Sequence, residues 1–158
     1  MKQYEPAQIR NMGLYGHQGS GKTTVAEAMC FLGKSTTRLC SVAEGNSNFD
    51  FEAEEIRRKS SMSTSIGYAE WGKTLINVID NPGDTNFAAD ATMAVVASDI
   101  GVLVVSAVDG LQVGTEKAFR LLSESGIPCM VMMTKVDKER ANYDRVLSQI
   151  REALGAGV

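Results

Sequence analysis

One short stretch restricts this chain more than any other feature of its sequence. It follows the spacing GxxxxGK[ST], and its residues are Gly16-His17-Gln18-Gly19-Ser20-Gly21-Lys22-Thr23. The apolar run at residues 9–15 predicts a strand before it. Residues 22–32 predict a helix after it, because their apolar side chains recur three and four positions apart. A strand, this loop and a helix, in that order, indicate a phosphate-binding loop.

The residue types of this loop suit an anion that carries several negative charges. Glycines let the backbone come close to phosphates, and successive N–H groups then point inward. The amino-terminal end of the helix adds the positive end of its dipole. We expect Lys22 to reach the β- and γ-phosphates, Thr23 to ligate Mg²⁺ and Thr24 to donate to the α-phosphate. The alternative is a glycine-rich turn with an incidental lysine, and the flanking strand and helix disfavour it.

The rest of the chain alternates short apolar runs with helical patterns, which predicts parallel strands joined by crossover helices. We expect further strands at 66–71, 74–80, 100–107 and 129–134, and helices at 86–97, 115–124 and 139–154. Gly72-Lys73 predicts a tight turn, so the strands around it form an antiparallel hairpin. Residues 33–65, the long connecting segment, lack periodicity, which is typical of functional or mobile loops. The predicted fold is an α/β three-layer sandwich of the P-loop NTPase class, with a mostly parallel sheet.

A second candidate motif follows the strand predicted at 74–80. Asp80 ends that strand and Asn81-Pro82-Gly83 come next, about 60 residues after the phosphate loop. A carboxylate at this place can hold Mg²⁺ through water, and the Gly83 N–H can bond the γ-phosphate. Glycine also allows the peptide to flip when that phosphate leaves. Taken alone these residues are typical of a β-turn, but after a phosphate loop they indicate a γ-phosphate sensor.

A third motif, Thr134-Lys135-Val136-Asp137, follows the strand predicted at 129–134. In a guanine pocket the Asp137 carboxylate accepts from both N1–H and the exocyclic N2 amine. Adenine lacks that amine and presents a lone pair at N1, which a carboxylate cannot satisfy. The stem of Lys135 is expected to pack over the purine plane. The motif alone is weak, but its place favours GTP or GDP over the alternative, an ATP-dependent P-loop enzyme.

Composition excludes several other classes of function. The 158 residues fit one domain, and 44% hydrophobic with 22% charged residues is ordinary for a soluble protein. The net charge of −3 excludes a bulk basic face, so we do not expect sequence-specific DNA binding. The apolar runs are too short to span a bilayer, so we do not expect a membrane partner either. The one basic cluster is Arg57-Arg58-Lys59. It is either a local binding patch or simply part of a solvated loop. Three cysteines and a single histidine, His17, disfavour disulfides, a zinc site or a Ser-His-Asp triad, and favour a cytosolic protein.

In this order, the three motifs resemble those of the translational GTPases, and more closely elongation factor G and its elongation factor G-like paralogues. Further stretches agree, and they are Asp50-Phe51, Glu54-Glu55-Ile56-Arg57-Arg58-Lys59, Glu70-Trp71, Ala107-Val108-Asp109-Gly110-Leu111-Gln112-Val113-Gly114-Thr115-Glu116 and Asn142-Tyr143-Asp144-Arg145. The resemblance covers about residues 10–156. It implies a cytoplasmic, GTP-driven factor that docks on the ribosome and uses residues 33–65 and 81–90 as switches. By that likeness Ser61 is the hydroxyl that closes on Mg²⁺ when GTP is bound.

The resemblance also implies which residues contact the nucleotide. They are the eight residues of the phosphate loop with Thr24, then Asp80, Asn81, Pro82, Gly83 and Asp84, then Thr134, Lys135 and Asp137. The metal ligands it implies are Thr23, Ser61 and, through water, Asp80. Hydrolysis of GTP to GDP and phosphate would depend on Lys22, Gly83 and Asp84.

Four departures from the family pattern stand out. Asp84 replaces the usual histidine that orients the attacking water, and a carboxylate beside three phosphates is repelled unless it is protonated or turned away. Hydrolysis is therefore expected to be slow or differently assisted, and the alternative function is a regulatory paralogue that binds GTP or GDP. Thr134 replaces an asparagine and Gly19 an aspartate. The last Ser-Ala element of base recognition is not found, so we expect residues 1–158 to be a GTP-binding domain from a longer factor, without the final strand and helix.

Overall fold

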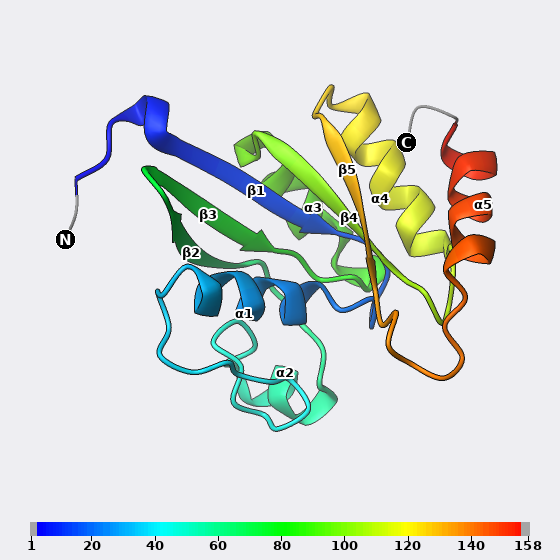
Figure 1. Ribbon diagram of the computed structural model, residues 1–158, viewed down its shortest axis with the longest axis horizontal. Coiled ribbons are helices and arrows are strands. Elements are labelled where there is room, and N and C mark those ends of the chain that lie inside the picture. Colours follow the sequence, from blue (N-terminus) through cyan, green and yellow to red (C-terminus); the bar gives the residue numbers. More distant parts are fainter. Residues whose placement is uncertain (1–2, 156–158) are drawn as a thin grey trace.

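A five-stranded mixed sheet forms the centre of the protein in the computed structural model, which describes residues 3–155 (Figure 1). Its strands are β1 (Ile9–Tyr15), β2 (Ser65–Trp71), β3 (Thr74–Asp80), β4 (Ile100–Ser106) and β5 (Cys129–Thr134). The spatial order is β2-β3-β1-β4-β5. Strand β2 is antiparallel to β3, while all other neighbouring strands are parallel. The predicted hairpin and the mostly parallel sheet are therefore confirmed.

Helices cover both faces of this sheet. They are α1 (Lys22–Leu32), α2 (Ala53–Arg58), α3 (Ala88–Ala97), α4 (Val113–Glu124) and α5 (Tyr143–Leu154), with 3₁₀ turns η1 (Pro6–Gln8) and η2 (Thr85–Phe87). In Figure 1, α1 and α2 lie below the sheet, and α3, α4 and α5 lie on its other side. The three layers are those of the predicted α/β sandwich of the P-loop NTPase class. Within residues 3–155, none of the helices is both long and apolar enough to cross a membrane.

Two apolar cores fill the spaces between the layers, because successive strand residues point to opposite faces. On β1, Leu14 packs in the core beside α1, whereas its neighbour Tyr15 packs in the core beside α3, α4 and α5. Strand β4 divides in the same way, with Val104 in the first core and Val105 in the second. Both faces of β4 are therefore covered, which explains its unbroken apolar sequence.

Several predicted boundaries were wrong by a few residues. The helix predicted at 139–154 begins only at Tyr143, because Asn142 Oδ1 accepts from Arg145 N at 2.9 Å and caps the helix there. The helix predicted from residue 86 begins at Ala88, after the η2 turn, and α4 begins two residues earlier than predicted. The long connecting segment also contains α2, which had not been predicted. A reciprocal pair of hydrogen bonds between Glu52 and Glu55 closes the start of α2.

Candidate nucleotide site

The phosphate loop joins β1 to α1 and takes backbone conformations that side chains rarely allow. Gly16, Gly19 and Gly21 have φ angles of 137°, 75° and 98°. At Gly16 the space is also closed, since a Cβ there would lie 2.4 Å from the Val104 carbonyl oxygen. The glycines of the spacing are therefore required by the path of the backbone. The loop wraps over the end of β4 and feeds directly into the first turn of α1.

Lys22 and Gly83 meet at this loop although they lie far apart in the sequence. The Lys22 ammonium donates to the carbonyl oxygens of Gly16 at 3.1 Å and His17 at 3.0 Å. Gly83 lies against the other side of that ammonium, because a Cβ on it would be 2.3 Å from Lys22 Nζ and 2.5 Å from Gln18 N. Only glycine fits there. The backbone of Gly83 is thus held beside the cation expected to bind the terminal phosphates.

The three predicted metal ligands also come together. The Thr23 hydroxyl donates to Asp80 Oδ2 at 2.6 Å, and the Ser61 hydroxyl donates to Asp50 Oδ1 at 2.6 Å. The two hydroxyl oxygens are 3.1 Å apart. Each hydroxyl has one proton, so when both protons go to carboxylates the remaining lone pairs face each other. Two oxygens that present only lone pairs to each other suit a small hard cation such as Mg²⁺.

The carboxylates around these hydroxyls agree with that fit. Among residues 3–155, the buried second oxygens of Asp80 and Asp50 have no hydrogen-bond partner. No group of three or more His, Cys, Asp or Glu in the same part of the chain could hold an ion by itself. This is the donor set expected for Mg²⁺, which proteins usually hold through one or two carboxylates together with substrate phosphates.

Burial sets the protonation of the two charged groups at the centre of the site. Loss of water raises the pKa of Asp80 to about 7, although the Thr23 hydroxyl and the Lys22 ammonium oppose the shift. Loss of water lowers the pKa of Lys22 to about 8, against the attraction of Asp80 and Asp50. Both groups are at most 5% exposed. Their charged forms are therefore poorly solvated, and a bound cation and phosphates would favour ionised Asp80 and charged Lys22.

A cavity of about 180 Å³ opens beside these groups. The predicted residues that line it are Gln18, Gly19, Gly21, Lys22, Thr23, Thr24, Ser61, Gly83 and Lys135. Four lining residues were not predicted as site residues, namely Val42, Asp50, Lys59 and Ser60. All four come from the long connecting segment, whose irregular sequence gives little signal. Only Asp50 and Lys59 had a signal in the sequence that could mark them as site residues, because both lie in stretches that carry the family resemblance.

Other predicted residues lie outside this cavity. They are Gly16, His17, Ser20, Asp80, Asn81, Pro82, Asp84, Thr134 and Asp137. The Asn81 side chain donates to the Leu14 carbonyl at 3.2 Å and accepts from the Thr64 hydroxyl at 2.9 Å, so it joins β1 to the start of β2. The Asp84 carboxylate accepts from Asn86 N at 2.9 Å and caps the η2 turn. Asp84 and Pro82 line a separate cavity between α3 and α4. Contact of these residues with a nucleotide stays a prediction.

The end of β5 adjoins the phosphate loop. The Thr134 hydroxyl donates to the Ser20 carbonyl and lies 3.3 Å from the Val105 carbonyl. Lys135 has a φ of 56°, and its ammonium donates to Asp109 Oδ2 at 3.3 Å. The Asp137 side chain is 75% exposed and faces outward next to Lys138. Thr134 thus fastens the loop to the sheet, while the exposed Asp137 carboxylate pairs with the Lys138 ammonium at 3.7 Å, and its contact with a base stays a prediction.

Replacing Thr134 by valine is expected to lower the free energy of unfolding by about 1–2 kcal/mol, because the Ser20 carbonyl loses its donor. Valine keeps the shape of threonine, so packing changes little. Thr134→Ser keeps the hydroxyl and serves as the matched control. Urea unfolding of the three proteins measures the difference. Equal stability of the valine and serine variants would show that this hydrogen bond does not hold the loop.

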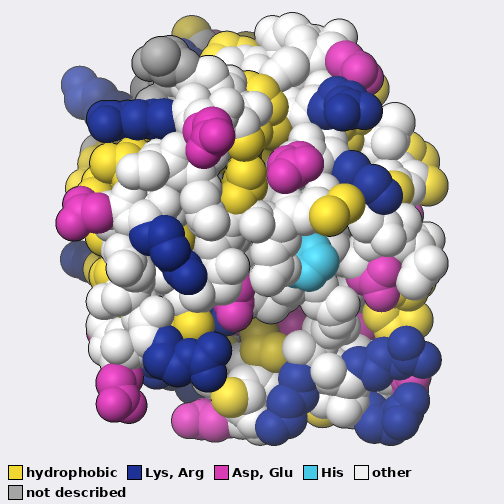
Figure 2. Space-filling view, turned by 90° about the vertical axis from the view of Figure 1, so that its right-hand side faces the viewer, with side chains coloured by type: hydrophobic (Ala, Val, Ile, Leu, Met, Phe, Trp, Pro, Cys, Tyr) yellow, Lys and Arg dark blue, Asp and Glu magenta, His cyan; other side chains and the backbone are white. Residues whose placement is uncertain are grey.

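Basic side chains lie around this end of the molecule. Lys59 and Lys135 line the cavity beside Lys22. Figure 2 shows Lys and Arg side chains along the lower edge of the view, the edge at which α2 and the loop after β5 lie in Figure 1. The chain as a whole has a net charge of −3. Lys22, Lys59 and Lys135 thus supply positive charge at the cavity where a polyphosphate is expected to bind.

The family described as elongation factor Tu GTP binding domain matches residues 7–157. The chain belongs to this family. The match takes in the phosphate loop, the turn that contains Gly83 and the end of β5, so all three candidate motifs lie inside it. The chain is thus a GTP-binding domain of the elongation-factor type, and the predicted resemblance to translational GTPases is confirmed.

Named relatives of this elongation-factor domain agree. The chain is 32% identical over 155 residues to elongation factor G of Dehalococcoides mccartyi, which covers 98% of the chain and 22% of that protein. It is 33% identical over 150 residues to an elongation factor G-like protein of Mycobacterium tuberculosis, covering 95% of the chain and 21% of that protein. A crystal structure of a protein from Thermus thermophilus matches with a TM-score of 0.89 and 34% identity, over 94% of the chain and 22% of its own. The chain spans about a fifth of the length of these relatives.

Proposed function

We propose that this domain binds GTP with Mg²⁺ and hydrolyses GTP to GDP and phosphate, as part of a cytoplasmic translation factor of the elongation factor G type that acts on the ribosome. One observation carries the proposal. Residues from three distant parts of the sequence, Lys22-Thr23, Ser61 and Asp80-Gly83, meet around two hydroxyl oxygens that lie 3.1 Å apart. This is the arrangement that phosphoryl transfer requires, since catalysis there depends on positioning and on neutralising charge.

Each residue of the site has a defined part in the proposed reaction. Lys22 would neutralise charge on the β- and γ-phosphates, and the loop N–H groups would hold their oxygens. Mg²⁺ held by Thr23 and Ser61 would supply further positive charge at the phosphate oxygens. Gly83 would bond the γ-phosphate and release it after hydrolysis. Ser61, through the metal, and Gly83, through its N–H, would therefore both respond to the γ-phosphate.

Competition between nucleotides tests the proposal directly. With Mg²⁺ present, GTP and GDP are expected to displace a fluorescent guanine nucleotide from the 158-residue chain, whereas ATP is expected to do so at least about 100 times less well. Removing Mg²⁺ with EDTA is expected to weaken GTP binding. Equal competition by ATP would support the ATP-dependent alternative, and no binding of either nucleotide would reject the proposal.

The position of Asp84 supports a second candidate function, a regulatory paralogue that binds guanine nucleotides and hydrolyses GTP poorly. In elongation factor G, as the resemblance implies, a histidine at this place orients the attacking water. Here the carboxylate is used as a cap on Asn86 N and lines the cavity behind Gly83. A carboxylate that serves as a cap is not at the same time free to orient a water molecule, which supports slow hydrolysis.

Replacing Asp84 by histidine therefore separates the two functions. If the domain is the regulatory paralogue, the variant is expected to hydrolyse GTP at least about tenfold faster in single-turnover assays with ribosomes, because an imidazole can orient the attacking water. Asp84→Asn removes the charge, keeps a capping oxygen and serves as the control. A large gain with histidine alone supports the regulatory paralogue. An unchanged or lower rate with histidine supports the hydrolase, because the site would then act without that side chain.

A further inference from the structure

Glu27 is a buried carboxylate on α1 that the proposed reaction does not use. It is 0% exposed and lies one helical turn after Thr23, beside Ala26 and Cys30 of the core. A carboxylate in such a place is costly unless donors surround it. Its donors all come from the long connecting segment: the Ser47 hydroxyl at 2.8 Å, Asn48 Nδ2 at 2.8 Å and the Asn48 backbone N–H. Glu27 therefore fastens this segment to α1.

Ser47 also fixes the position of the residues that follow it. While its hydroxyl donates to Glu27, its oxygen accepts from Phe49 N at 3.1 Å and Asp50 N at 3.2 Å. These bonds fix the turn at residues 47–50. The Phe49 side chain is 2% exposed and packs against α1 in the same core as Cys30. Polar and apolar contacts together thus place the backbone of Asp50.

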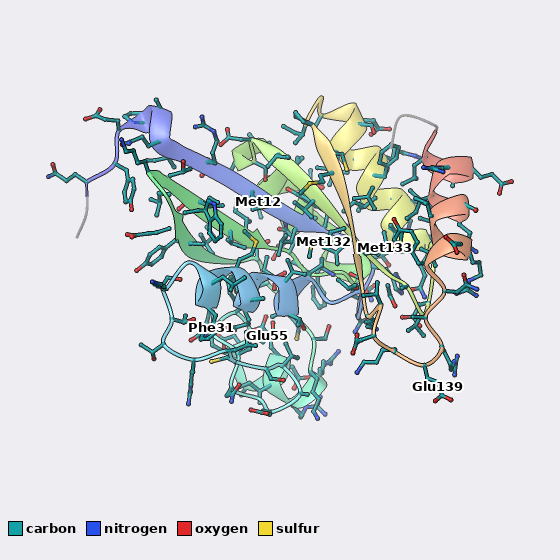
Figure 3. The ribbon with its side chains drawn as sticks, in the orientation of Figure 1. Met12, Phe31, Glu55, Met132, Met133 and Glu139 are labelled. Carbon is teal, nitrogen blue, oxygen red and sulfur yellow. The ribbon has the colours of Figure 1, made fainter. Side chains whose placement is uncertain are left out.

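Asp50 completes a closed chain of contacts that begins and ends on α1. Its carboxylate accepts from the Ser61 hydroxyl, and Ser61 lies 3.1 Å from Thr23. The order is Thr23, Ser61, Asp50, Ser47 and Glu27, and the two ends are successive turns of one helix. By contrast Glu55, labelled below α1 in Figure 3, accepts from Met62 N and Ser63 N and ties the segment only to itself.

We infer that Glu27 is a positioning residue, which holds residues 47–50 on α1 in every nucleotide state so that Asp50 can place Ser61 on the metal. The inference rests on the proposed function, because it assigns a part in the response to GTP. The two ends of the closed chain differ in kind. The contact between Thr23 and Ser61 depends on what binds in the site, whereas the bonds of Glu27 are made by the protein alone.

The attachment shortens the part of the segment that must be ordered when GTP binds. When residues 47–50 are bonded to α1, about 10 residues lie between this attachment and Ser61. Without the attachment, about 30 residues lie between the end of α1 and Ser61. Loop closure makes ordering of the longer loop about fivefold less favourable. GDP binding does not need Ser61 on the metal, so this cost falls on the triphosphate alone. Glu27 therefore favours GTP over GDP from a position outside the cavity.

The test compares affinities for a non-hydrolysable GTP analogue and for GDP, at saturating Mg²⁺, in the 158-residue chain. Glu27→Gln removes the charge that the donors face, and Ser47→Ala removes only the hydroxyl link. Both are expected to lower the affinity for the analogue about fivefold or more while GDP affinity stays within about twofold. Ser47→Thr keeps the hydroxyl and is expected to restore the parent ratio.

A matched control comes from the same segment. The Ser35 hydroxyl also bonds α1, at the Cys30 carbonyl 2.9 Å away, but stands outside the closed chain. Ser35→Ala is expected to leave the ratio of the two affinities unchanged. Equal losses of affinity for the analogue and for GDP, or no loss for either, would overturn the inference. If Glu27→Gln does not fold, the same outcome for Ser47→Ala alone would overturn it. A parent chain that binds neither nucleotide would reject the proposed function instead.

Discussion

Replacing Lys22 by alanine is expected to lower the affinity for GTP by about 100-fold or more. The ammonium is 5% exposed and lies between the loop carbonyls and Gly83, so phosphates bound there would interact with it away from water. Losing one partner of such a desolvated charged contact costs about 2–5 kcal/mol, and each 1.4 kcal/mol corresponds to about tenfold in affinity. Titration with a fluorescent GTP analogue in the presence of Mg²⁺ measures the change.

The loss is expected in binding and not in folding. Burial lowers the pKa of Lys22 to about 8, so the cost of desolvating the charged ammonium offsets much of what its two hydrogen bonds contribute to folding. The free energy of unfolding without nucleotide should therefore change by no more than about 1 kcal/mol. Lys73→Ala, at the exposed turn between β2 and β3, is the control and should bind like the parent. An alanine variant at Lys22 with full affinity would place the phosphates elsewhere.

The fold and the centre of the site could be predicted because both follow from the order of the strands. Lys22 and Asp80 are distant in the sequence, yet Asp80 ends strand β3 and Lys22 follows the loop after strand β1. Strands β1 and β3 are neighbours, and Leu14 is paired with Asp80 in their register. Short apolar runs identified those strands, and the glycine spacing identified which strand end carries the loop.

The long connecting segment could not be predicted, because buried polar contacts between distant residues hold it. Glu27 bonds Ser47 across 20 residues, and Ser61 meets Thr23 across 38. Such pairs leave no period in the sequence. The short helix α2 left a local signal, since two glutamates stand three residues apart at its start, but six residues are too few for a helical repeat to be visible.

Residue type alone also did not predict the hydrogen bonds that two side chains of the turn after β3 make within the protein. Asn81 and Asp84 belong to the predicted nucleotide contacts, which stay predictions, and both side chains also bond the protein itself. Asn81 bonds Leu14 and Thr64, and Asp84 caps Asn86. Asparagine and aspartate bond nearby backbone readily, so in a turn their contacts depend on the local path of the chain. The motif did not predict that path, whereas it did predict a part for Gly83.

Replacing Asp137 by asparagine is expected to lower the affinity for GTP by about 100-fold and to raise that for xanthosine triphosphate. The carboxylate accepts from two guanine donors, whereas the amide nitrogen of asparagine would oppose one of them. Xanthine has a carbonyl where guanine has its amine, so the same nitrogen can donate to it. Competition between the two nucleotides against a fluorescent analogue measures the exchange.

The control for this change is Glu139→Gln, because Figure 3 shows Glu139 at the outer end of the same loop, pointing away from the sheet. It removes one negative charge near the site and is expected to leave the preference for GTP intact. The Asp137 side chain is 75% exposed before a base covers it, so its removal should barely alter unfolding. If Asp137→Asn lowers binding of both nucleotides equally, Asp137 supports the loop and does not select the base.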